Sequence, residues 1–187
     1  MALENIKYTT LKEFFHMREN SSELMEFIDG VIYMSPSPST KHQRISGRLY
    51  VGLFNYLEGT DCEVFDAPFD IILHKDDIEE DKVVIPDLAV LCDKTGLNEL
   101  NYKGVPSLIV EILSPSNQSH DLVLKLNLYM KYGVKEYWII NPMLDSIQVY
   151  SLDENGGYIQ KDNKVSKGII ESKVLEGFSV DLEKIFK

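Results

Sequence analysis

Apolar residues in the first third of the chain recur with two different periods. Residues 10–20 have the spacing of a short helix. Residues 24–36 contain two apolar runs around Asp29-Gly30, a pair that favours a tight turn and therefore predicts a β-hairpin. From residue 39 or 40 to residue 57 the apolar positions recur every fourth residue, so a long helix is expected. Its inward face carries Ile45, Leu49, Leu53 and Leu57.

The rest of the chain alternates strand patterns with one further long helix. Short apolar runs bounded by turn residues predict the strands. The expected segments are two strands in 62–73 bent near Pro68, strands at 83–93 and 107–113, turn and capping residues at 114–121, a helix at 121–133, a hairpin at 135–152, short strands near 157–160 and 171–177, and a helical turn at 181–186. This order predicts a mixed α/β (α+β) fold in a single domain over residues 1–187. We expect a mixed central sheet flanked by helices, with a hairpin near the N-terminus and hairpins near the C-terminus.

The segment 106–115, with the sequence PSLIVEILSP, places one acid, Glu111, inside an apolar strand. Side chains alternate between the two faces of a strand, and both faces are apolar here apart from Glu111. Such strands usually lie at the centre of a sheet and are covered by helices on both sides. An unpaired carboxylate in that layer would be costly or would be protonated. Glu111 is therefore expected to face a cation or strong hydrogen-bond donors.

The run VVIPDLAVL at 83–91 contains a second isolated acid, Asp87, directly after Pro86. Because proline cannot donate to a central strand ladder, we expect a bulge or a sheet edge here. Two carboxylates placed close together repel, so either one takes a proton or a divalent cation lies between them. Oxygen ligands of this kind suit Mg²⁺ or Mn²⁺. The hypothesis requires Asp87 and Glu111 to lie on the same side of the sheet.

Three further residues carry chemistry that fits such a site. Lys125 lies on one helical stripe with Tyr129 and Tyr132, so its ammonium is expected to reach toward the acids, with the tyrosines packed beneath it. His42 lies on the inward face of the first turn of its helix. It is either a core or capping residue or a neighbour of a phosphate or metal-bound water. Glu26 lies on the first hairpin, either as an exposed strand acid or beside the metal site.

Composition limits the class of protein. The chain has 187 residues, of which 44% are hydrophobic and 26% charged, which is enough to bury a core in one domain. No run of about 18 apolar residues is present, so no membrane span is expected. The N-terminal residues lack the pattern of a signal peptide. Cys62 and Cys92 lack metal-type spacing and are interpreted as reduced thiols of a cytoplasmic protein.

The formal net charge of −11 argues against a protein with a broad basic face for nucleic acid. It still allows a local basic groove. The candidate cations for such a groove are Lys41, Arg44 and Arg48 on the long helix, and Lys125, Lys131 and Lys135 on or just after the later helix.

An ordered set of motifs resembles the Uma-type endonucleases, a bacterial family long filed as a domain of unknown function. The motifs are PD at 86–87, VEILS at 110–114, D-x-x-x-K-x-x-x-Y at 121–129, GVKEYWIINP at 133–142, and MEFIDGVIYMSP at 25–36 followed by KH at 41–42. The resemblance extends from about residue 8 to residue 186. This family belongs to the restriction-endonuclease-like, PD-(D/E)XK superfamily.

The resemblance implies a restriction-endonuclease-like fold and Mg²⁺-dependent hydrolysis of phosphodiester bonds, with DNA as the expected partner. Asp87 matches the aspartate of the PD motif, and Glu111 matches the first acid of the E-x-K element; both would hold the metal ion. Leu113 occupies the usual lysine position, and Lys125 matches a lysine that has moved to the next helix. Glu26 matches an additional acid of the family, and His42 matches a helix histidine.

Two other functions are compatible with the same residues. In a non-catalytic module that binds a partner or oligomerises, Asp87, Glu111 and Lys125 would form a buried ion network. A glycosidase with two carboxylates is also conceivable, but it leaves Lys125 without a role. Exposed strand edges in the C-terminal hairpins could pair across a two-fold axis, so a homodimer is expected.

Overall fold

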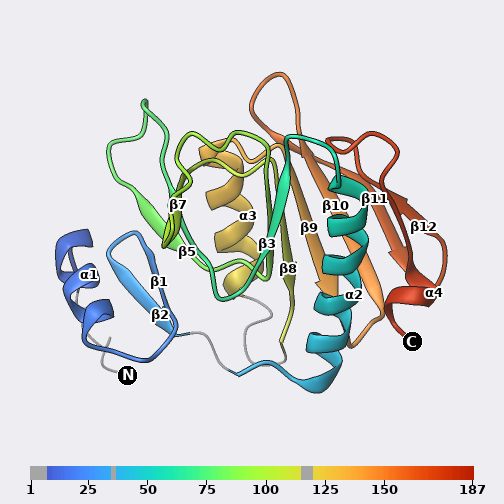
Figure 1. The fold of residues 1–187 in the computed structure, drawn as a ribbon, viewed down its shortest axis with the longest axis horizontal. Coiled ribbons are helices and arrows are strands. Elements are labelled where there is room, and N and C mark those ends of the chain that lie inside the picture. Colours follow the sequence, from blue (N-terminus) through green and yellow to red (C-terminus); the bar gives the residue numbers. More distant parts are fainter. Residues whose placement is uncertain (1–7, 35–36, 115–119) are drawn as a thin grey trace, which may run out of the picture.

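The strands divide between two larger sheets and a small ribbon in this computed structural model, which describes residues 8–34, 37–114 and 120–187 (Figure 1). The five-stranded sheet has the order β2 (Val31–Met34), β1 (Met25–Ile28), β5 (Lys82–Val84), β4 (Asp70–Leu73), β7 (Asn101–Gly104). The six-stranded sheet has the order β11 (Tyr158–Val165), β10 (Ser146–Leu152), β9 (Glu136–Asn141), β8 (Leu108–Ile112), β6 (Leu88–Leu91), β3 (Glu63–Asp66). The ribbon pairs β12 (Ile169–Glu171) with β13 (Ser179–Asp181). The predicted class, mixed sheet flanked by helices, is confirmed, although two sheets replace the expected single one.

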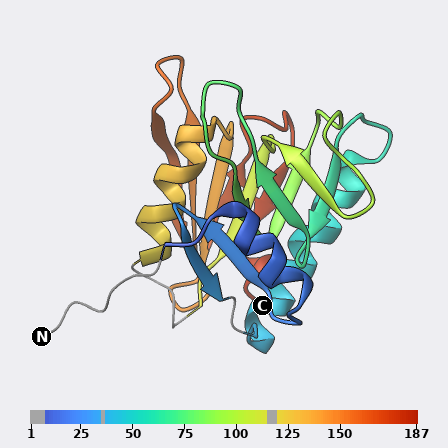
Figure 2. The same ribbon diagram turned by 90° about the vertical axis from the view of Figure 1, so that its left-hand side faces the viewer.

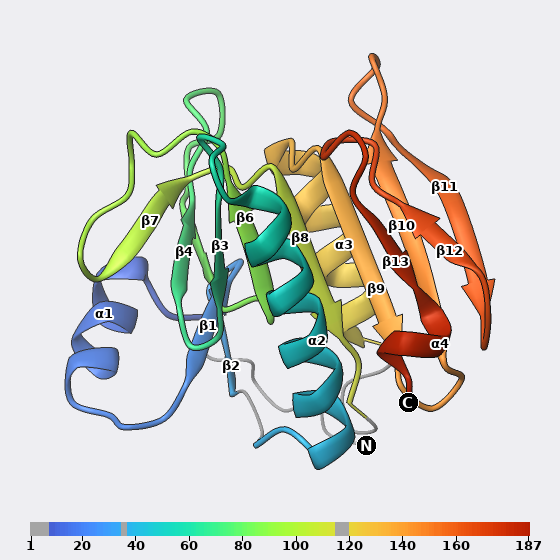
Figure 3. The same ribbon diagram turned by 45° about the vertical axis from the view of Figure 1, so that its right-hand side comes forward.

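The helices lie around these sheets. Their bounds are α1 (Leu11–Glu19), α2 (Thr40–Leu57), α3 (His120–Tyr132) and α4 (Leu182–Ile185). Figure 3 shows α2 in front of the six-stranded sheet and α3 behind it. The predicted turn before α3 falls largely on residues 115–119, outside the described residues, as do the side chains of residues 120–122.

Strand β8 lies at the centre of this arrangement. It pairs with β6 on one side and with β9 on the other. Leu108, Val110 and Ile112 pack with the inward residues of α2, whereas Ile109 and Leu113 pack with α3. The predicted central strand, apolar on both faces, is therefore confirmed, and Glu111 lies on the α3 face.

The first hairpin and α1 form the N-terminal edge of the molecule, which faces the viewer in Figure 2. Asp29 and Gly30 have φ angles of 50° and 78°. Positive φ at both central positions is the requirement of the tightest hairpin turns, and glycine meets it without strain. Phe14 of α1 packs against Phe27 of β1, with ring centroids 5.4 Å apart, so the helix anchors the hairpin that carries Glu26.

A long bent ribbon connects the two larger sheets. β3 pairs with β6 in the six-stranded sheet, whereas β4 pairs with β5 in the five-stranded sheet. The ribbon changes sheet at residues 67–69 on one strand and 85–87 on the other, where the Ala67 N–H donates to the Asp87 carbonyl. The expected strand at 83–93 is thus two strands. Neither is the sheet edge expected at Pro86, since β5 lies between β1 and β4 and β6 lies between β8 and β3; the strand is instead interrupted there as the chain passes from one sheet to the other.

The remaining differences from prediction involve short strands. β7 was not expected, because its sequence NYKG lacks an apolar alternation. The strand expected near 171–177 is displaced, because β12 and β13 lie on either side of this segment and pair with each other. Leu175, between them, is buried in a turn, and its N–H donates to the Ser172 hydroxyl. Within the described ranges, no helix combines the length and the apolarity needed to cross a bilayer.

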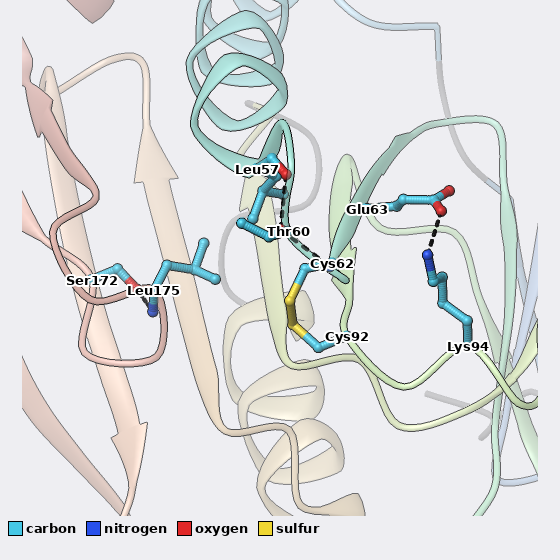
Figure 4. The surroundings of a disulfide bond; sticks show 8 residues. All are labelled: Leu57, Thr60, Cys62, Glu63, Cys92, Lys94, Ser172 and Leu175. Carbon is cyan, nitrogen blue, oxygen red and sulfur yellow. Dashed lines mark hydrogen bonds and ion pairs between the residues drawn. A yellow bond between two sulfur atoms is a disulfide. The ribbon is translucent and has the colours of Figure 1, made fainter.

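Cys62 and Cys92 form a disulfide, so the interpretation as reduced thiols is wrong (Figure 4). Glu63 of β3 lies opposite Leu91 of β6 in an antiparallel pair. The next pair outward is Cys62 and Cys92, with their Cα atoms 4.0 Å apart. Strand pairing brings the two cysteines together across 30 residues of sequence, which their spacing does not reveal.

Candidate active site

All five candidate site residues line one cavity of about 350 Å³. Glu26 comes from β1, His42 from α2, Glu111 from β8 and Lys125 from α3, while Asp87 lies where the bent ribbon changes sheet. The condition set by the sequence, that Asp87 and Glu111 lie on the same side, is therefore met. Further polar residues lining the cavity include Ser37, Gln43, Ser46, Asp66 and Ser114.

Asp87 is fixed at the end of β8 by two contacts. Its Oδ2 accepts a hydrogen bond of 2.7 Å from the backbone N–H of Ile112. Its Oδ1 lies 3.1 Å from Nε2 of His42. Each carboxylate oxygen has two lone pairs, so Asp87 keeps acceptor capacity for a ligand.

Lys125 lies between two other acids. Its Nζ is 3.0 Å from Oε1 of Glu26 and 3.0 Å from Oε1 of Glu111. Oε1 of Glu26 also accepts from the backbone N–H of Ile85, at 2.8 Å. Because Glu26 is only 5% exposed, its interpretation as an exposed strand acid is wrong.

Tyr129 also contacts the site, which sequence reasoning missed. It was expected only to pack beneath Lys125, but its hydroxyl donates a 2.6 Å hydrogen bond to Oε1 of Glu111. Its position four residues after Lys125 on the same stripe was a usable signal. The backbone donors of Ile85 and Ile112 carried no sequence signal, because every residue except proline has an N–H.

Burial and mutual charge shift the pKa values of these groups. Burial raises the pKa of Glu111 to about 7; the charges of Asp87 and Glu26 add to this, while Lys125 and Tyr129 oppose it. Burial acts to lower the pKa of Lys125, but the charges of Glu111 and Glu26 outweigh it and raise the value. Lys125 is therefore an ammonium at neutral pH.

His42 is 9% exposed. Burial acts to lower its pKa, but the hydrogen bond and charge of Asp87, the charge of Glu111 and a backbone interaction with Ile112 outweigh burial and raise the value. Its Nδ1 is buried and has no hydrogen-bond partner among the described residues. The helix cap is the Ser39 hydroxyl, which accepts from the His42 backbone N–H, so the capping role for the side chain is wrong.

The donor set can be compared with what a divalent cation requires. Asp87 and Glu111 offer hard carboxylate oxygens, the ligands that Mg²⁺ and Mn²⁺ prefer. In the described part of the chain, no group of three or more His, Cys, Asp or Glu side chains is arranged to hold a metal ion. Mg²⁺ commonly takes one or two protein carboxylates and keeps several waters, and the residues present fit that mode.

The fold places the protein in the class of mixed α/β proteins with helices on both sides of a central sheet. It is similar to a crystal structure from Anabaena variabilis ATCC 29413, described as a putative nuclease belonging to DUF820. The two match with a TM-score of 0.72 and 19% sequence identity, over 95% of this chain and 97% of that chain.

The chain belongs to the Uma2 family, described as "Putative restriction endonuclease", whose sequence profile matches residues 11–183. This confirms the resemblance in the motifs and supports a nuclease as the class of activity. Two uncharacterized proteins of Synechocystis sp. (strain ATCC 27184 / PCC 6803 / Kazusa) are similar along most of their length. Slr1290 is 27% identical in sequence, and the match covers 91% of this chain and 88% of slr1290. Sll1609 is 25% identical, and the match covers 80% of this chain and 84% of sll1609.

Proposed function

We propose that the protein is a metal-dependent endonuclease that hydrolyses phosphodiester bonds in DNA. The observation that carries the proposal is the convergence of Glu26, His42, Asp87, Glu111 and Lys125, from separate elements, on one cavity. Acids together with a buried ammonium are what phosphodiester hydrolysis requires, because charge must be balanced around an anionic phosphate. Membership of the Uma2 family supports the same chemistry.

Asp87 and Glu111 would hold Mg²⁺ or Mn²⁺. When bound, the cation would supply positive charge to the phosphate oxygens and acidify the attacking water. The protein prepares both acids for this role: Ile112 and His42 orient Asp87, and Lys125 and Tyr129 hold Oε1 of Glu111.

Lys125 would act as a fixed positive charge. Sequence reasoning left open whether it orients or deprotonates water or stabilises developing charge. Its raised pKa argues against deprotonating water, and its two carboxylate partners keep the ammonium in place. A preorganised charge of this kind stabilises the transition state of phosphoryl transfer. Asp87 holds Nε2 of His42, so the imidazole is fixed at the cavity wall, where it would orient Asp87 beside the substrate.

The non-catalytic alternative also has an observation in its favour. Lys125 is already paired with two acids, as in a purely structural ion network. A protein with such a structural network would show no specific binding of a divalent cation at this cavity, and it would not hydrolyse DNA.

Metal titration followed by a DNA-nicking assay tests the proposal. We expect calorimetry to detect binding of Mn²⁺ or Mg²⁺ by the wild-type protein, and Asp87→Asn to lose it. The wild-type protein should nick supercoiled DNA with either metal and stop when EDTA is added. A wild-type protein that binds neither metal and cleaves no DNA would support the non-catalytic alternative.

A second buried lysine provides a matched control for Lys125. Lys82 is 2% exposed and pairs with Asp29 and Glu80, away from the cavity. Lys125→Met should lower the nicking rate roughly a hundredfold or more, the scale of losing one preorganised group. Lys82→Met should destabilise the fold but leave the nicking rate of folded protein unchanged. Equal loss in both variants would mean that Lys125 acts only through stability.

We also propose that the protein acts as a homodimer in the cytoplasm. β11 is the outermost strand of its sheet and most of its side chains are exposed, so a second copy could pair with it. The Cys62–Cys92 disulfide of the structure is an observation against this location, because thioredoxin and glutathione keep thiols reduced in the cytoplasm. A cytoplasmic location therefore predicts that this bond is opened in cells. Sedimentation velocity tests the dimer, and rapid alkylation of cells followed by a thiol count tests the location.

A further inference from the structure

A groove lies beside α2, next to the candidate active site. It has a volume of about 570 Å³ and runs between α2 and the segment formed by β13 and α4, which lie side by side in Figure 3. Its floor is apolar and includes Val51, Phe178, Val180 and Ile185. Gln43 lines both this groove and the active-site cavity, so the two hollows adjoin across the N-terminal half of α2.

The positively charged side chains of α2 lie at positions where they do not stabilise the helix. The helix contains Lys41, Arg44 and Arg48, no acid, and no basic residue in its last turn. The N-terminal end of a helix is already positive, so cations there are unfavourable. An arrangement that weakens the helix is expected where the cations serve a partner of opposite charge.

The three cations differ in their contacts. Lys41 pairs with Asp145, and Arg48 donates to the carbonyls of Ile185 and Lys187. Arg44 lines the groove, is exposed, and has no hydrogen bond or ion pair with any described residue. Lys184 lies on the opposite wall, 76% exposed at its side chain, with one distant carboxylate, that of Asp181, at 3.8 Å.

Gly47 opens the wall of the groove. A Cβ added there would meet no atom within 4 Å, so the backbone of α2 is accessible from the groove. Glycine in the middle of a helix costs roughly 1 kcal/mol relative to alanine. A phosphate or sugar could therefore approach the helix closely between Arg44 and Lys184.

We propose that this groove binds the stretch of DNA strand that leaves the active-site cavity. The inference rests on the proposed nuclease function, because an endonuclease must accommodate a strand that continues beyond the cleaved bond. Arg44 and Lys184 contact phosphates, and the apolar floor receives the sugar or base of the same strand. A local basic groove continuous with the cavity favours this occupant over a peptide, in a chain whose net charge is −11.

Binding of fluorescein-labelled single-stranded DNA tests the groove separately from catalysis. Anisotropy is measured over a range of salt concentrations, with Asp87→Asn as the common background to prevent cleavage. Adding Arg44→Gln should weaken binding about fivefold, the scale of one exposed ion pair, and should reduce the log–log salt slope by about 0.7. Lys12→Gln, which removes an exposed cation from α1 instead, should change neither quantity.

Gly47 can be replaced by a side chain of either charge, because a Cβ added there would contact no other atom. Gly47→Glu should weaken DNA binding and Gly47→Lys should strengthen it, and both replacements favour the helix over glycine, so both should fold. Equal affinities for the two variants would overturn the proposal, as would an Arg44→Gln effect no larger than that of Lys12→Gln. A change in sedimentation of the free protein with unchanged DNA affinity would instead identify the groove as a self-association surface, which also overturns it.

A small diester separates this proposal from the function on which it rests. Bis(4-nitrophenyl) phosphate would occupy the cavity alone, so variants of Arg44 and Gly47 that retain Asp87 should hydrolyse it at the wild-type rate. Loss of its hydrolysis in those variants would mean that they damage the cavity, which contradicts a separate groove. If wild-type protein binds DNA through the groove but hydrolyses neither substrate, the groove stands and the nuclease proposal fails.

Discussion

At the residue scale, the candidate site is short of positive charge. Glu26, Asp87 and Glu111 face one permanent cation, Lys125, together with His42, whose pKa is raised by Asp87 and Glu111 against the effect of burial. The excess of negative charge has its clearest effect at Glu111, where burial raises the pKa of the carboxyl group to about 7. A divalent cation would offset this excess of negative charge, which supports the proposal that Glu111 is a metal ligand.

The shift at Glu111 predicts how stability depends on pH. Its pKa is about 7 in the fold against 4.5 as reference, so the folded protein binds this proton more tightly than the unfolded chain does. The resulting stability is present below pH 4.5 and is lost as the pH rises to 7. Between these values wild type should lose about 3 kcal/mol relative to Glu111→Gln, measured by urea unfolding. Parallel curves for the two proteins would contradict this assignment.

Tyr129 gives a second prediction at this scale. Tyr129→Phe removes the hydrogen bond to Oε1 of Glu111 without opening a large cavity. The free energy of unfolding should fall by about 1–3 kcal/mol, as for a buried hydrogen bond to a charged group. Binding of Mn²⁺ should also weaken, because Glu111 is less firmly held. Tyr132→Phe is the control: it removes a hydroxyl that bonds to the Glu80 carbonyl, and it should leave Mn²⁺ affinity unchanged.

At the element scale, the disulfide connects β3 to β6 and closes a loop with a sequence separation of 30 residues. Cys62→Ala with Cys92→Ala should lower the free energy of unfolding by about 3 kcal/mol, because the unfolded chain regains the freedom of that loop. Reduction of wild-type protein should produce the same loss in urea unfolding. A reductant that also destabilises the double variant would show that its effect is unrelated to this bond.

Helices and strands whose apolar residues follow a clear pattern were predictable from the sequence. The apolar stripe of α2 predicted its buried face, and the apolar run of β8 predicted a strand covered on both sides. β7 and the turn at Leu175 were missed because whether a short segment forms a strand depends on the strands that pair with it, which its own sequence does not reveal. The division into two sheets was also missed, because Pro86 signals a break but not which sheet each half joins. The five site residues came from their motif resemblance and from unusual placement of charge.

At the scale of the whole molecule, we propose that the chain is one domain. Ile71 and Val84 of the five-stranded sheet pack in the same core cluster as Ala89 and Ile109 of the six-stranded sheet. The sheets should therefore unfold together. Trp138, the single tryptophan, reports on β9, whereas far-ultraviolet circular dichroism reports on both sheets. Coincident urea transitions by the two methods are expected, and a separate fluorescence transition would indicate two units.

The bend at residues 85–87 has a consequence for which sequence changes the family can accept. Successive side chains of a strand point to opposite faces, so one inserted or deleted residue reverses every side chain beyond it. At this bend such a change would turn the Asp87 carboxylate away from Glu111 while leaving Glu26 in place. The loop at residues 74–81, at the far end of the ribbon, can grow or shrink without that penalty. Length variation among relatives should therefore accumulate in that loop and be absent from the tripeptide Ile85–Asp87.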